Sequence, residues 1–67
     1  MDIRERLAAN LKRLRHERGL SQEKFAFEVD IHRTYISDLE RGALNPTITV
    51  VDKLSQYLKV SVGELLD

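Results

Sequence analysis

The sequence predicts one all-α domain that covers residues 1–67 and contains five short helices. Apolar residues recur at steps of three and four along most of the chain, the spacing that places them on one face of a helix. Glycine, serine and threonine stand at the ends of these stretches, where they terminate or cap helices. Cysteine is absent, so close packing or a second copy of the chain must supply the stability that disulfides give many small domains.

The first two helices are expected on either side of Gly19. The first has apolar residues at steps of four, four and three: Ile3, Leu7, Leu11 and Leu14. Gly19 follows its last turn and readily takes the left-handed conformation that ends a helix. Ser21 is expected to cap the second helix, although Lys24 stands where a reciprocal capping box needs Glu or Gln.

The third helix is expected to begin at His32 or Arg33 and to end at Arg41, because Gly42 stops it. Residues 43–46 follow as a loop, since an Asn-Pro pair signals a turn and proline disfavours the helical region for the residue before it. Two breaks close together, at Asp30-Ile31 and at Gly42, make this helix short.

The fourth helix is expected from Thr47, its cap, to about Lys59. Its apolar face steps by three, three and four: Ile48, Val51, Leu54 and Leu58. Its β-branched start would also suit a strand, but its length and cap favour a helix. Ser61 and Glu64 form a complete capping box, so a last short helix should run toward Leu66.

Composition excludes several classes of protein. No apolar run is long enough for a membrane span or a signal peptide, which predicts a soluble, untargeted, cytoplasmic protein. His16 and His32 lack metal-ligand spacing, and the chain shows no phosphate loop and no nucleophile beside a base. We therefore expect no enzyme activity, no metal, no cofactor and no small-molecule ligand. Eleven basic and eleven acidic residues give zero net charge, which argues against a generic polyanion binder.

The two central helices and their tight turn form the arrangement called helix-turn-helix. The chain resembles the Cro/repressor-type (XRE) helix-turn-helix family at the following positions: Ser21, Gln22, Ala26, Ile31, Ile36, Ser37, Leu39, Glu40, Arg41 and Gly42. The resemblance implies a compact five-helix, lambda-repressor-like DNA-binding domain with the motif at about residues 21–41. Asp30 replaces the usual turn glycine and Phe25 the usual leucine. Asp tolerates the left-handed conformation better than most residues, so the turn can still form. Phe25 adds volume, and neither change undermines the fold.

The outer face of the third helix is the expected DNA-reading surface. At about 100° per residue, Ile36 and Leu39 point inward, whereas the opposite face can form hydrogen bonds throughout. That pattern alone also fits a plain solvated face, but the family resemblance favours DNA recognition. The residues expected to contact bases are Arg33, Thr34, Ser37 and Asp38. Arg33 leads because its guanidinium can donate two bonds to guanine, whereas Asp38 either accepts from cytosine or tethers Arg33 or Arg41.

The resemblance also implies contacts to the DNA backbone and one internal ion pair. The residues expected at the backbone are Ser21, Gln22, Tyr35, Arg41 and Asn45. For three of them a plain structural role stays open: a cap for Ser21, half-burial for Tyr35 and a loop position for Asn45. The family's ion pair corresponds to Arg15 and Glu40, which helical geometry places at the edges of their apolar faces.

A second copy of the chain is the expected protein partner. Val62, Leu65 and Leu66 would form a two-fold dimer interface, unless they only close the core of one chain. The function implied is a transcriptional regulator that binds double-stranded DNA as a homodimer on an inverted repeat. The closest resemblance is to small controller proteins of restriction–modification systems. The alternative is an antitoxin or coactivator-type module of the same fold, whose main partner is a protein.

The zero net charge hides an uneven distribution. Residues 1–24 carry net +3, residues 25–45 net −2 and residues 46–67 net −1. A DNA-binding domain with this balance is expected to bind non-specific DNA weakly and to show a modest salt dependence.

Overall fold

The computed structural model describes residues 2–67, and these residues form helices without any strand. The helices are α1 (Ile3–Glu17), α2 (Gln22–Val29), α3 (Arg33–Glu40), α4 (Ile48–Leu58) and α5 (Val62–Leu66). The predicted all-α fold is therefore confirmed, and the boundaries agree with the sequence signals to within a residue or two. Over residues 2–67, no helix combines the length and the apolar character that a membrane crossing requires.

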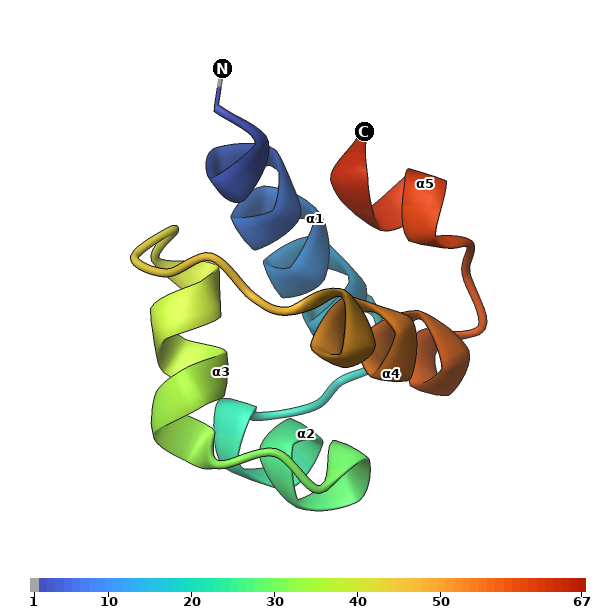
Figure 1. The fold of residues 1–67 in the computed structure, drawn as a ribbon. Coiled ribbons are helices and arrows are strands. Elements are labelled where there is room, and N and C mark those ends of the chain that lie inside the picture. Colours follow the sequence, from blue (N-terminus) through green and yellow to red (C-terminus); the bar gives the residue numbers. More distant parts are fainter. Residues whose placement is uncertain (1) are drawn as a thin grey trace.

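The helices pack around α1, with α3 and α5 both against it and α2 against α3. Figure 1 shows the N- and C-termini on one side of the molecule and α2 on the opposite side. The loop after α3 passes in front of α1 before α4 begins (Figure 1). This arrangement leaves α3 at an edge of the molecule, where one of its faces is free.

The caps of α2, α4 and α5 are those that the sequence predicts. The hydroxyl oxygens of Ser21, Thr47 and Ser61 accept hydrogen bonds from backbone N–H groups at 3.0, 3.2 and 3.0 Å. Ser61 and Glu64 complete the only reciprocal box that the sequence predicted. His32 caps α3, since its Nδ1 accepts from the Thr34 N–H at 3.1 Å.

Four residues adopt the left-handed conformation where helices end. Gly19 and Gly42 have φ values of 66° and 69°, as expected for glycines after α1 and α3. Asp30, in the turn between α2 and α3, has φ 58° and so fills the usual glycine position without breaking the turn. Lys59 also has φ 58° after α4, a position that the sequence did not single out.

The core is continuous and draws on every helix. The largest fully buried side chains are Phe25, Leu11, Ile36, Leu39, Leu54, Leu58 and Leu65. The Phe25 ring packs against Tyr57, with ring centroids 5.8 Å apart, so the extra volume of Phe25 is used in packing α2 against α4.

Two residues predicted on apolar helix faces do not reach this core. Ile3 is 49% exposed and Ile48 is 88% exposed. Each is the first residue of its helix, where no preceding turn covers the side chain and periodicity cannot decide burial.

Candidate nucleic-acid interface

The start of α3 presents an exposed outer face, as the helical pattern predicted, whereas Ser37 and Asp38 further along the helix are half-buried. Ile36 and Leu39 are buried, whereas Arg33 and Thr34 at the start of the helix are exposed. A shallow, open hollow of about 280 Å³ is lined by His32, Arg33, Thr34 and Ser37. Hydrogen-bonding groups therefore face outward from the first two turns of α3, where a base edge could reach them.

Two ion pairs occupy the charged residues of this face. The Arg33 guanidinium lies 3.9 Å from the carboxylate of Glu23 on α2, with both side chains well exposed. Asp38 pairs with Arg41, the residue that follows α3 and caps its C-terminus. Of the two arginines that Asp38 was expected to tether, the structure thus favours Arg41 over Arg33. The Glu23 contact was not predicted, because it depends on how α2 and α3 cross.

The predicted Arg15–Glu40 ion pair is confirmed and joins α1 to the end of α3. Arg15 Nε donates to Glu40 Oε2 at 2.7 Å and Arg15 Nη2 donates to Glu40 Oε1 at 2.9 Å. The side chains are 9% and 1% exposed. A paired geometry of this kind compensates the cost of burying both charges.

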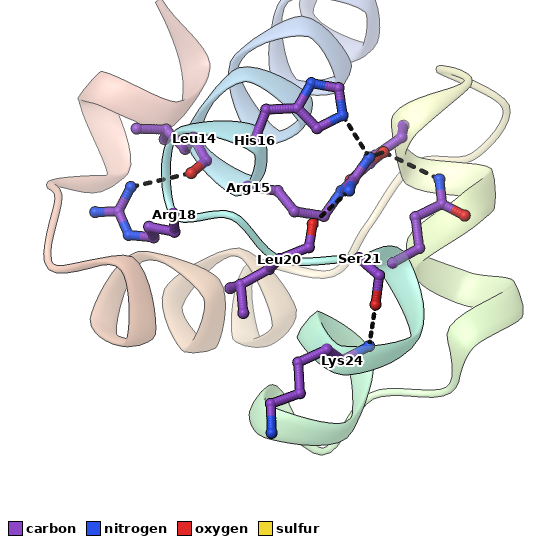
Figure 2. A network of polar contacts seen from close by, with 9 residues as sticks. Leu14, Arg15, His16, Arg18, Leu20, Ser21 and Lys24 are labelled. Carbon is purple, nitrogen blue, oxygen red and sulfur yellow. Dashed lines mark hydrogen bonds and ion pairs between the residues drawn. The ribbon is translucent and has the colours of Figure 1, made fainter.

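Arg15 also reaches the chain segment that leads into α2, as Figure 2 shows. Its Nη1 donates to the Leu20 carbonyl oxygen at 2.7 Å, and Nη2 lies 3.1 Å from His16 Nε2. On the other side of the pair, Gln22 Nε2 donates to Glu40 Oε1 at 3.0 Å. The network therefore holds the start of α2 through the backbone of Leu20, two residues before it, and through its first side chain.

Burial and hydrogen bonding act on the Glu40 carboxyl in opposite directions. Burial, the largest single influence, raises its pKa. The hydrogen bonds from Arg15 and Gln22 and the Arg15 charge lower the pKa, and together they outweigh burial. The net result is a pKa below the ordinary value of 4.5. Glu40 is therefore ionised at neutral pH and holds its two donors.

The residues predicted at the DNA backbone differ in exposure, and of these Gln22 bonds to the network. Ser21 is exposed and caps α2, so its hydroxyl already accepts a hydrogen bond. Tyr35 is half-buried and packs against the core, which is the structural part of its predicted mixed role. Arg41 and Asn45 are exposed at and after the end of α3.

The predicted dimer residues separate into two groups. Leu65 is fully buried within the chain, so its predicted place in an interface is corrected to the alternative role of closing the core. Val62 is 39% exposed and Leu66 is half-buried. A hollow of about 190 Å³ places Leu66 beside Ile3 and Ile48. Val62 stands one helical turn before Leu66 on α5, and residues four apart share a helix face. We call Ile3, Ile48, Val62 and Leu66 the apolar patch.

Sequence reasoning missed Ile3 and Ile48 as surface residues, since it assigned them to the core. The signal was present in their position at the first turn of a helix, where burial is least certain. Among residues 2–67, no group of three histidine, aspartate or glutamate side chains is placed to hold a metal ion.

The short helix pair, its tight turn and the free face of α3 define a helix-turn-helix domain. Residues 11–65 match the Helix-turn-helix family HTH_3, and the chain belongs to this family.

Three comparisons place the chain within the family. It is 53% identical to control protein C.BamHI of Bacillus amyloliquefaciens over 49 residues, which are 73% of this chain and 60% of that protein. It is 42% identical to control protein C.MunI of Mycoplasma sp, covering 96% of this chain and 88% of that one. The restriction–modification controller protein C.Esp1396I, solved as a tetramer with its natural 35 base-pair operator, matches with a TM-score of 0.82 and 29% identity. That match covers 100% of this chain and 99% of the other.

Proposed function

We propose that the protein binds double-stranded DNA sequence-specifically, as a homodimer on an inverted repeat, and thereby regulates transcription. The observation that carries this proposal is the free face of α3, where exposed Arg33 and Thr34 stand beside half-buried Ser37 and Asp38. A helix presented in this way fits the major groove of B-DNA, which is about 12 Å wide. The similarity to C.Esp1396I, whose structure was solved on its operator, supports the same use of the fold.

Each residue of the interface has a chemical role in this proposal. Arg33 donates both bonds to a guanine, while Thr34 and Ser37 contact neighbouring base edges. Asp38 positions Arg41 or accepts from a cytosine. The contacts to the DNA backbone, which set the register on the duplex, come from Ser21, Gln22, Tyr35, Arg41 and Asn45.

The apolar patch is the proposed dimer surface. Val62 and Leu66 keep the role that the sequence predicted, and exposed Ile3 and Ile48 extend it. A small domain gains stability when such residues are covered by a second copy. Two-fold symmetry then places two recognition helices about 34–36 Å apart, one turn of DNA.

The biological role that we infer is that of a restriction–modification controller. Relatives of similar length, such as C.MunI, are control proteins, which favours this role over an antitoxin or coactivator-type module. The proposal includes a cytoplasmic location and no catalytic step.

Selection from random duplexes tests the proposal. The purified protein is incubated with a library of duplexes that share a randomised core, and bound molecules are amplified and sequenced. We expect an inverted repeat with half-sites one helical turn apart, because a two-fold dimer imposes that spacing. Enrichment of no common sequence would contradict sequence-specific binding, and a single unrepeated half-site would contradict the dimer.

A further inference from the structure

The first side chain of α2 is held in place before any DNA arrives. Gln22 Nε2 donates to Glu40 Oε1 at 3.0 Å, and the same oxygen accepts from Arg15 Nη2 at 2.9 Å. Glu40 is almost completely buried and Arg15 is fixed on both sides, by Glu40 and by the Leu20 carbonyl. A glutamine anchored to such a group has lost much of its rotamer freedom already.

The anchored amide still has a hydrogen to give. A glutamine NH₂ group carries two donors, and the bond to Glu40 uses one of them. Gln22 is only half-buried and stands at the N-terminus of α2. The second N–H is therefore available to a phosphate oxygen that approaches this helix end, beside the backbone N–H groups that favour anions there.

The buried pair also controls the charge at this point. A lone carboxylate near the DNA backbone would repel it, but Arg15 forms two hydrogen bonds to Glu40 and neutralises it. Glu40 can thus orient the amide without a net charge that opposes a phosphate.

We propose that Glu40, held by Arg15, is a positioning residue for DNA binding that acts through Gln22. The proposal rests on the proposed function, since it requires that Gln22 meet a DNA phosphate. Ordering a long side chain on binding weakens affinity, and pre-ordering removes that penalty. Glu40 therefore contributes to affinity for DNA that it does not touch.

A double-mutant cycle separates this role from a purely structural one. The variants are Glu40→Gln, Gln22→Ala and the combination, and the readout is affinity for the inverted repeat that selection yields. We expect Glu40→Gln alone to weaken binding about 2- to 10-fold, the cost of ordering one side chain. In the Gln22→Ala background the same change should have no further effect, because the side chain that Glu40 positions is absent.

The sign of the effect is itself informative. Glu40→Gln removes a negative charge near DNA, so a simple charge effect would tighten binding, and that result would overturn the proposal. An equal loss in both backgrounds would also overturn it, since Glu40 would then act only on the fold. Asp52→Asn is the matched control, because Asp52 Oδ2 accepts from the Gln56 amide at 2.8 Å on α4. We expect no change in affinity for this variant.

A measurement on the unmodified protein covers the case in which Glu40→Gln does not fold. Side-chain ¹⁵N relaxation of the free protein should give the Gln22 amide an order parameter near that of rigid backbone, about 0.85, whereas the exposed Asn45 amide should fall below about 0.6. A mobile Gln22 amide would overturn the proposal. Failure of the unmodified protein to bind any selected duplex would instead refute the proposed function.

Discussion

Arg33 illustrates how a single residue of α3 would serve the proposed interface. Its guanidinium is held by Glu23 at 3.9 Å, and both side chains are more than half exposed. Exposed pairs of this kind stabilise a protein by only about 0–1 kcal/mol, so Arg33 can exchange Glu23 for a guanine edge at small cost. Its exposure followed from the helical pattern, whereas the contact with Glu23 did not, because it depends on the crossing of two helices.

Glu40 likewise makes one contact that the sequence predicted and one that it did not. Helical geometry and the family resemblance together predicted its pair with Arg15, and the structure confirms it. The Gln22 bond to the same carboxylate could not be predicted, since it joins α2 to α3, whose packing angle no sequence pattern records.

At this scale we expect the protein to lose stability in acid through Glu40. Its pKa is lower in the folded chain than the ordinary 4.5, so below about pH 4.5 the unfolded state binds more protons. The stability that the carboxylate contributes is present above that pH and is lost as pH falls through the folded pKa. Thermal unfolding between pH 7 and pH 3 should therefore show a smaller drop in Tm for Glu40→Gln than for the unmodified protein.

Asp2 provides the comparison for this measurement. Hydrogen bonds from Arg4 lower its pKa to about 2, but the pair lies at the surface, so its effect on stability is screened by solvent. Asp2→Asn should keep most of the acid sensitivity. An equal drop in Tm for Glu40→Gln and the unmodified protein would contradict the assignment.

At the scale of helices, the ends were more predictable than the buried faces. Caps and terminating glycines act within three or four residues, so Ser21, Gly42 and Ser61 could be identified from neighbours alone. Burial depends on what packs against a helix, and the pattern therefore misplaced Ile3 and Ile48. The end of α4 lies between these cases, since its boundary was expected but the left-handed Lys59 was not.

We expect Lys59→Gly to stabilise the fold by about 0.5–1 kcal/mol. Lys59 has φ 58°, a conformation that is costly for residues with a Cβ atom and accessible to glycine. Part of that gain is offset, because glycine gives the unfolded chain more freedom. Urea unfolding at fixed protein concentration measures the difference.

Lys12→Gly is the opposite control. Lys12 is exposed in the interior of α1, where glycine costs roughly 0.5–1 kcal/mol. The two lysine variants have the same change in charge and opposite expected signs. Destabilisation by both would show that the left-handed position of Lys59 carries no strain.

For the whole molecule, the places where the charges lie matter more for DNA binding than their sum. The chain sums to zero, yet the proposed backbone contacts are made mainly by neutral groups, with Arg41 as the cation among them. With one such cation per protomer, a dimer neutralises about two phosphates and should show a slope of log affinity against log salt of about −2. The zero balance therefore fits a binder whose affinity comes from recognition more than from bulk attraction.

Self-association is also a property of the whole molecule, and a substitution at Ile48 tests it. Its side chain is 88% exposed, so Ile48→Asp should leave the folded chain intact but place a charge in the apolar patch. We expect roughly 10-fold weaker self-association or more, measured by sedimentation at several concentrations, because burying an unpaired charge at an interface is costly.

Phe27→Asp is the matched control for the dimer. Phe27 is 71% exposed on α2 and lies outside the apolar patch, so this variant should associate like the unmodified protein. If Phe27→Asp dissociated the dimer and Ile48→Asp did not, the interface would lie on the other side of the molecule.

The central claim is sequence-specific recognition of duplex DNA by the outer face of α3. The most direct measurement is a titration of the protein against the selected inverted repeat and against a shuffled duplex of the same composition, at one salt concentration. We expect the selected duplex to bind about 1,000-fold more tightly or better. Arg33→Ala should reduce that ratio. Arg13→Ala, which removes an exposed arginine paired with Glu17 on α1, should leave it unchanged. Equal affinity for the two duplexes would contradict the claim.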